Sequence, residues 1–485
     1  MTKTRKGDEI NLIDSSLYSV SGTSVSTSLY VVSGIIYTLV TDVSTAGIYM
    51  FIIIGVSLFT RPIRGVSQAL HKIGSEQNES VASYFSITLI SGVIYFLLFS
   101  VILVLINDIV QQISIYETRL LLPVIGIAGI QILSGISTDL MSASGYPGFV
   151  SWIRGLSDFI KYFILIVFAD LIVTVSDIVL IYVVLGLIIH TSVILYFRVI
   201  LTKPTRREIK RVWNYAKWSS PNQVFDRFTY NMPSYVLGVV ASPVAVGIYE
   251  SADRFADFGA TISWNLSKPI LSKVSGEWSV DPDSAQTYLN SSVTGGIGIT
   301  FLVFGYILSS FDTLSNLAFS DHQQVFAYTI ILVGGVNIIR GLWTILSHVM
   351  KGVNRPDVSL KTKVAGVITG LPVMIVLGSE YGALGGAVGY VVMNLTIGSL
   401  MIWYVYDEFG RVIIDTKLIG LYCLATTVSA VTTGIFMQFF SPTVATTLIG
   451  LMVCVSIFFS VMYITSQKTR KVTKRVYELA TQGIR

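Results

Sequence analysis

An apolar run that opens with GIY at 247–249 and is centred near Ala260 carries four charged side chains that share one face of a predicted helix. Glu250, Asp253, Arg254 and Asp257 are spaced i, i+3, i+4 and i+7, the spacing of neighbours on a helix surface. The same face continues through Thr261, Asn265 and Lys268. A charge inside a bilayer costs about 2.5–3.5 kcal/mol on insertion scales, so these groups are expected to face a partner or a water-filled cavity.

The segment just before it has a second polar face. It holds Gln223, Asp226, Arg227, Tyr230 and Ser234. Together with Arg340 in a later apolar run, Arg227 and Arg254 suit an anionic headgroup. A planar guanidinium donates two parallel hydrogen bonds to phosphate oxygens and stays charged at any working pH. We therefore interpret these segments as the lining of a central substrate cavity that includes Tyr230 and Asn265.

Two other roles are open to these charges. Asp226, Asp253 or Asp257 could bind a coupling H+ or Na+. Alternatively, Arg254 pairs with Asp253 or Asp257, and Arg227 with Asp226, as structural ion pairs between packed helices. No other cofactor is expected. The four histidines and two cysteines are dispersed along the chain, so neither a metal site nor a catalytic residue is predicted.

The elements that must position these residues are apolar helices. Hydrophobic residues make up 52% of the 485 and charged residues 13%, against about 25% charged residues in soluble domains. Runs of about 18 to 26 residues carry no charge, which is enough to cross a ~30 Å hydrocarbon core as helix. We predict an all-α integral membrane protein with about 14 transmembrane helices. Their centres lie near Ser28, Ile54, Ile94, Ile130, Ile164, Leu187, Tyr230, Ala260, Gly298, Gly335, Gly370, Val391, Thr427 and Val453.

The distribution of basic residues predicts the orientation. Cytoplasmic connections collect Lys and Arg, and with both termini cytoplasmic 28 of the 33 basic residues lie inside, most densely in the linker at 198–217. Arg61, Arg64 and Arg154 are assigned to cytoplasmic connections, and only Arg119 falls outside. Because topology accounts for the net charge of +5, no nucleic-acid partner is predicted. We expect a multi-pass monomer in the cell membrane.

The chain also repeats itself. GIY occurs at 47–49 and 247–249, and MSASGYP at 141–147 matches MKGVNRP at 350–356, an offset of 209. Each half would hold six helices of the same orientation, so the two lobes should be related by a pseudo-two-fold axis along the membrane normal. The predicted parts are a lobe at 1–215 with its basic linker, a lobe at 216–410, and two further helices with a basic tail at 411–485.

Several short motifs resemble a known family. They are GIY at 247–249, ADR at 252–254, MKG at 350–352, NRP at 354–356 and EYGALGGA at 380–387. Together with the plan of six, six and two helices, they are similar to the polysaccharide-exporting flippases of the multidrug/oligosaccharidyl-lipid/polysaccharide (MOP) superfamily. The resemblance implies transport of a polyprenyl-phosphate-linked saccharide from the cytoplasmic to the outer leaflet, for surface polysaccharide or glycoprotein assembly. The arginines would hold the phosphate while the lipid tail stays in the bilayer.

Two parallel lobes suit an alternating-access transporter with its site near mid-membrane, and two other functions compete with the flippase. A cation-coupled multidrug or metabolite exporter of the same superfamily would depend on the acids, with Arg254 only their partner. A membrane glycosyltransferase or polymerase usually needs a sizeable loop outside the membrane. The longest external connections predicted here, at 107–118 and 311–322, are short. We therefore expect a transporter and no enzymatic activity.

Overall fold

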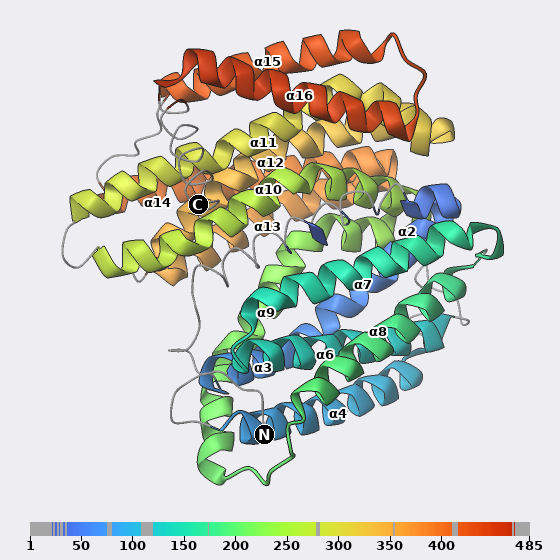
Figure 1. Cartoon of the computed structure of the whole chain (residues 1–485), viewed down its shortest axis with the longest axis vertical. Helices are drawn as coiled ribbons and strands as arrows, with labels where there is room; N and C mark the ends of the chain where they lie inside the picture. The colour runs from blue at the N-terminus through green and yellow to red at the C-terminus, as the bar shows by residue number, and fades with distance from the viewer. Residues whose placement is uncertain are drawn as a thin grey trace, which may run out of the picture. The chain divides into compact units, whose positions relative to one another are not determined.

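The computed structural model describes residues 36–74, 80–107, 120–172, 174–277, 282–352, 355–409 and 416–467, with a few isolated positions outside them. Within these ranges, side chains are not described at 262–296 and at a few other positions. Apart from two short 3-10 turns, the described secondary structure is α-helical (Figure 1). The all-α prediction is therefore confirmed.

The helices follow one another with short connections. The first seven are α2 (Val43–Phe59), α3 (Arg61–Gly74), α4 (Val81–Leu105), α6 (Leu121–Ala143), α7 (Pro147–Val167), α8 (Val175–Phe197) and α9 (Arg206–Val240). The remainder are α10 (Pro243–Glu277), α11 (Pro282–Ala318), α12 (Gln323–Gly352), α13 (Pro356–Tyr381), α14 (Ala383–Phe409), α15 (Thr416–Met437) and α16 (Val444–Thr465). The 3-10 turns are η3 (Ala169–Leu171) and η4 (Ser320–His322).

Nine of the described helices are long and apolar enough to cross a membrane, and α2 with the first part of α3, bent by 59°, is either a broken span or a re-entrant loop. Each predicted centre from Ile54 to Val453 lies in its own helix, and Ser28 lies outside the described residues. Helices α7, α9 and α10 fall below that apolar threshold because they carry the charges discussed below. The arrangement is compatible with 14 spans.

The internal repeat is visible in the backbone. At the α6–α7 junction the amide of Tyr146 donates to the Met141 carbonyl at 3.0 Å, and at the α12–α13 junction Arg355 donates to Met350 at 2.8 Å. Tyr146 (φ −122°, ψ 48°) and Arg355 (φ −113°, ψ 56°) share one conformation, and a proline opens the next helix in both. These junctions stand at the offset of 209 residues predicted from the sequence.

The starts of α2 and α10 match in the same way at an offset of 200. The Asp42 carboxylate accepts from the Thr45 amide at 2.9 Å, and the Ser242 hydroxyl oxygen accepts from the Ala245 amide at 3.2 Å. A side-chain oxygen in this position caps the unpaired amides of a helix N-terminus. Both halves therefore start their second helix with the same local structure.

By residue contacts the chain divides into two compact units, Met1–Glu250 and Ser251–Arg485. Helix α9 belongs to the first unit because it packs along α2 and α3. Helices α15 and α16 pack on each other and on α11 in the second unit (Figure 1). This division after Glu250 differs from the lobe boundary predicted at residue 215. The predicted division into lobes at 1–215 and 216–410 and an appendage at 411–485 stays a prediction.

The outer faces of the helices are apolar. In α4, Tyr84 and Phe85 are buried, whereas Leu97, Leu98 and Val101 are more than half exposed. A soluble protein rarely exposes such a continuous apolar surface, but lipid tails cover it in a bilayer. The protein is therefore a multi-span membrane protein.

Candidate functional site

Four arginines from three helices come together in the first unit. Arg61 and Arg64 lie on α3, Arg154 on α7 and Arg227 on α9. Arg61 is close enough to the other three for their positive charges to act on it. We call these residues the arginine cluster. Gathering like charges is unfavourable unless an anion or water compensates them.

The break between α2 and α3 brings two of these arginines into place. Helix α2 ends at Phe59 with Thr60 as its C-cap, and α3 starts at Arg61 in a new direction with Pro62 in its first turn. Along α3 the residues Ile63, Leu70 and Ile73 are buried in the core of the unit. The opposite face carries Arg61, Arg64 and Gln68 at spacings of three and four, so the amphipathic pattern directs the arginines away from that core.

The members of the cluster are held to different degrees. The Arg227 Nε donates to the Ser57 Oγ at 2.7 Å, and its guanidinium lies 5.5 Å from the Tyr230 ring centre. Arg64 Nη1 is 3.8 Å from the Asp139 Oδ2. Within the described residues, neither Arg61 nor Arg154 has a carboxylate at ion-pair distance. The cluster therefore has more positive charge than its one ion-paired carboxylate balances.

Helix α9 is positioned along α2 and α3 by a series of single contacts. The Ser219 hydroxyl donates to Gln68 Oε1 at 2.9 Å, and the Ser220 hydroxyl donates to the Pro62 carbonyl at 2.8 Å. At Gly65 an added Cβ would lie 2.3 Å from the Ser220 Oγ. Only glycine allows this approach, which holds Arg227 on the same side as Arg61.

A second charged pair lies deeper in α7. The Lys161 ammonium donates to the Asp158 carboxylate at 2.9 Å and lies 4.4 Å from the Tyr162 ring centre. The two members of this pair satisfy each other within α7. Such a pair compensates the cost of removing two charges from water.

The second unit holds its own buried charges, on α10 and α12. Arg340 Nη1 is 2.8 Å from Asp257 Oδ1, and the side chains are 12% and 5% exposed. The Thr261 hydroxyl donates to the other oxygen of Asp257 at 2.8 Å. Asp253 and Arg254 are buried on the same stretch of α10. We call Asp253, Arg254, Asp257 and Arg340 the charged core of the second unit.

The structure brings some of the predicted site residues together. Asp257 pairs with Arg340, and the alternative that Arg254 pairs with Asp253 or Asp257 stays a prediction. Arg227 lies in the arginine cluster, with Asp226 and Tyr230 half-buried beside it on α9. Asn265 lies in α10, but its side chain is not described. Glu250, at the start of the polar face, accepts a hydrogen bond from the Ser234 hydroxyl.

Sequence analysis missed Arg61, Arg64, Arg154 and Asp139 as site residues. The first three were assigned to cytoplasmic connections; the structure places them in the helices α3 and α7, and the side of the membrane on which they lie stays a prediction. Arg61 stands beside Pro62, and Arg64 and Arg154 lie near the ends of predicted spans. Arginines are common at such positions in loops. The signals that pointed to them are the spacing of Arg61, Arg64 and Gln68 on α3 and the lone carboxylate of Asp139 in an uncharged span.

Comparison with solved structures defines the class of fold. The chain resembles the lipid II flippase MurJ in an inward closed conformation, with a TM-score of 0.75 and 13% identity over 93% of this chain and 99% of that one. It also resembles a multidrug resistance MATE family transporter of the MOP superfamily in an inward-facing conformation, with a TM-score of 0.67 and 13% identity over 79% and 94%. The fold is thus that of the MOP transporters, which confirms the predicted resemblance and fold class.

A comparison of sequences finds a curated relative. The probable low-salt glycan biosynthesis flippase Agl15 of Haloferax volcanii is 22% identical over 265 residues. The match covers 54% of this chain and 54% of that protein, so the chain spans about half the length of the curated relative it matches. No protein-family model matches the chain.

Proposed function

We propose that this protein moves a polyprenyl-phosphate-linked saccharide from the cytoplasmic to the outer leaflet, for surface polysaccharide or glycoprotein assembly. The arginine cluster carries the proposal. Four guanidinium groups with one ion-paired carboxylate form a site for a phosphate group, because each guanidinium can donate two parallel hydrogen bonds to phosphate oxygens. The fold of a lipid II flippase and the similarity to a glycan biosynthesis flippase support the same class of substrate.

The three parts of such a substrate need different environments. The phosphate needs a cationic site, the saccharide needs water, and the polyprenyl tail stays in the lipid against apolar helix faces such as that of α4. Rocking of the two lobes would then change which side of the membrane the site faces. The protein binds and releases its substrate unchanged, so no bond is made or broken.

The charged core of the second unit has a separate role in this proposal. Arg254 and Arg340 would offer further guanidinium groups to an anionic substrate. Asp226, Asp253 or Asp257 would bind a coupling H+ or Na+, since a carboxylate paired with arginine in a buried site changes its interactions when a cation binds. A cation-coupled multidrug exporter is the second candidate, favoured by the buried acids of α10 and by the MATE-like fold.

Arg61→Ala tests the proposal against this alternative. A charge-assisted hydrogen bond contributes about 1.5–3 kcal/mol, so binding of a polyprenyl phosphate to the purified protein should weaken roughly tenfold to a hundredfold. Surface glycan should be absent from a strain that carries Arg61→Ala in place of the native gene. Arg206→Ala, on the exposed first turn of α9, is the matched control and should retain both activities. Unchanged glycan and unchanged binding in Arg61→Ala would exclude the proposed site.

A further inference from the structure

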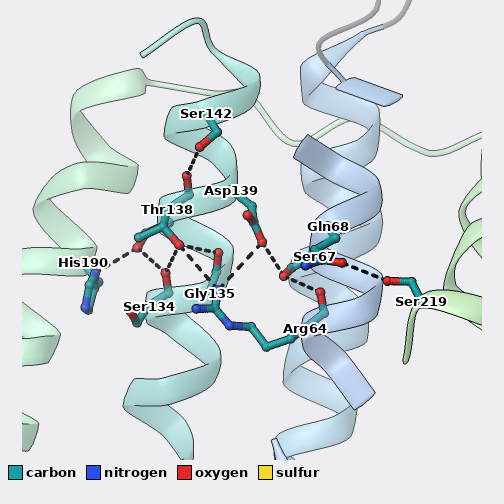
Figure 2. A network of polar contacts seen from close by, with 11 residues as sticks. Arg64, Ser67, Gln68, Ser134, Gly135, Thr138, Asp139, Ser142, His190 and Ser219 are labelled. Atoms are coloured by element: carbon teal, nitrogen blue, oxygen red, sulfur yellow. Dashed lines mark hydrogen bonds and ion pairs between the residues drawn. The ribbon is translucent and has the colours of Figure 1, made fainter. Parts of the chain in front are cut away.

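Asp139 on α6 is one of two carboxylates whose charges act on the arginine cluster, and the other, Asp158 on α7, is paired with Lys161. The Asp139 Oδ2 lies 3.8 Å from Arg64 Nη1, and the Asp139 charge also acts on Arg154. Figure 2 shows Arg64 extending from α3 to α6, toward Thr138 and Asp139. The Arg64 and Asp139 side chains are 25% and 14% exposed, so the pair is accessible at the edge of the cluster.

The two partners of this pair are held unequally. The Ser67 hydroxyl donates to Asp139 Oδ2 at 2.5 Å, which fixes the carboxylate to α3 (Figure 2). Among the described residues, the polar contacts of the Arg64 guanidinium are longer, at 3.8 Å to Asp139 and 3.5 Å to Thr138 Oγ1. A separation of 3.8 Å is too long for a hydrogen bond. Arg64 is therefore attracted to Asp139 without being locked to it.

Gly135 provides the surface on which Arg64 rests. An added Cβ at Gly135 would lie 2.7 Å from Arg64 Nη1 and 2.8 Å from its Cδ. Because Gly135 precedes Asp139 by one helical turn, α6 presents a flat surface and then a carboxylate to the same guanidinium. The absence of a side chain at residue 135 is what lets Arg64 lie there.

We propose that Asp139 is a positioning residue that competes with the substrate phosphate for Arg64. This inference rests on the proposed function. When the phosphate enters, the Arg64 guanidinium turns from Asp139 to the phosphate oxygens, and when the phosphate leaves, it returns to Asp139. The carboxylate repels the bound phosphate, which weakens binding and speeds release. A transporter needs this balance because a site that binds too tightly does not release its substrate.

Asp139→Asn tests the proposal, because asparagine keeps the shape and can still accept from Ser67. Removing one like charge near the phosphate should tighten binding of a polyprenyl phosphate to the purified protein about tenfold. The maximal rate of flipping of a polyprenyl-phosphate-linked fluorescent sugar in proteoliposomes should fall. Asp139→Glu should restore both values toward those of the parent protein. Asp321→Asn, on the exposed turn η4, is the matched control and should change neither.

A merely structural Asp139 would behave differently. Asp139→Asn would then lower the thermal stability and weaken binding, and either weaker or unchanged binding overturns the proposal. Gly135→Ala keeps every charge but displaces Arg64 from α6, and it should tighten binding in the same direction; weaker or unchanged binding there also counts against the proposal. If the parent protein binds no polyprenyl phosphate, or binds it equally well without Arg61, the proposed function itself fails. If binding needs Arg61 but ignores Asp139, only this inference fails.

Discussion

At the scale of single residues, the structure separates charges that are satisfied from charges that are not. Asp257 and Arg340 are 2.8 Å apart and almost unexposed, whereas Arg61 lies among arginines and has no carboxylate at ion-pair distance within the described residues. Removing one member of a buried pair leaves the other charge uncompensated. A cluster of uncompensated cations instead attracts an anion. The first arrangement stabilises the fold, and the second suits a binding site.

Arg340→Ala should therefore destabilise the protein. Loss of one partner of a buried ion pair costs about 3–5 kcal/mol, and thermal unfolding in detergent should show it as a clear drop in Tm. Arg355→Ala is the matched control, because Arg355 is 40% exposed in its pairs with Asp357 and Glu408, and partly exposed pairs contribute about 1 kcal/mol or less. A smaller drop in Tm for Arg340→Ala than for Arg355→Ala would contradict the structural role of the Asp257–Arg340 pair.

At the scale of elements, two equivalent helices of the repeat cross at two glycines. An added Cβ at Gly47 on α2 would lie 2.0 Å from the Pro243 carbonyl oxygen, and one at Gly247 on α10 would lie 2.6 Å from the Val43 carbonyl oxygen. Residues 43 and 243, like 47 and 247, are equivalent at the offset of 200. Each helix therefore meets its counterpart with the same residues, and small residues allow such close packing in membranes.

Gly47→Ala and Gly247→Ala should each push α2 and α10 apart at this crossing. The obstructing atoms are backbone oxygens, which cannot move aside as a side chain can. We therefore expect the free energy of unfolding to fall by roughly 1–3 kcal/mol, which is typical of overpacking. Gly55→Ala is the control on the same helix, since no atom lies within 4 Å of a Cβ added there. Thermal unfolding of the three variants in detergent makes the comparison. Equal stability of Gly47→Ala and Gly55→Ala would mean that the crossing is looser than the structure has it.

At the scale of the whole molecule, the exposed surfaces are those of a protein in a bilayer. The apolar outer faces of the helices suit lipid tails. The charged first turns of α9 suit the cytoplasmic side, where basic residues are retained.

At the start of α9 the Thr205 hydroxyl and backbone amide donate to the Glu208 carboxylate at 2.8 and 2.6 Å. Burial raises the pKa of Glu208, but these hydrogen bonds outweigh it and hold the pKa below its usual range.

The orientation is a prediction that labelling can test. With both termini cytoplasmic, the α15–α16 connection should lie outside and the linker before α9 inside. In a variant without Cys423 and Cys454, Ser441→Cys should react with a membrane-impermeant maleimide in intact cells. Lys203→Cys should react only after the membrane is permeabilised. Both positions are exposed, so access decides the result, and the reverse pattern would invert the topology.

The amino-acid sequence alone determined the helices, their order and the repeat. Whether a run crosses a membrane depends on its own length and polarity, and a proline after a helix end acts on its immediate neighbours. For this reason the predicted centres fall in separate helices, and the junctions at Tyr146 and Arg355 match. The two polar faces of α9 and α10 were also predictable, since helical spacing is a local property.

Only the tertiary structure decided which charges meet. Arg61, Arg154 and Arg227 come from distant segments, and Asp257 of α10 pairs with Arg340 of α12. Arg61 and Arg64, predicted to lie in a connection between two spans, lie after the bend at Phe59 in a helix that packs on α6 and α9. Contacts between helices depend on how their surfaces fit, and neither polarity nor spacing along one helix contains that information.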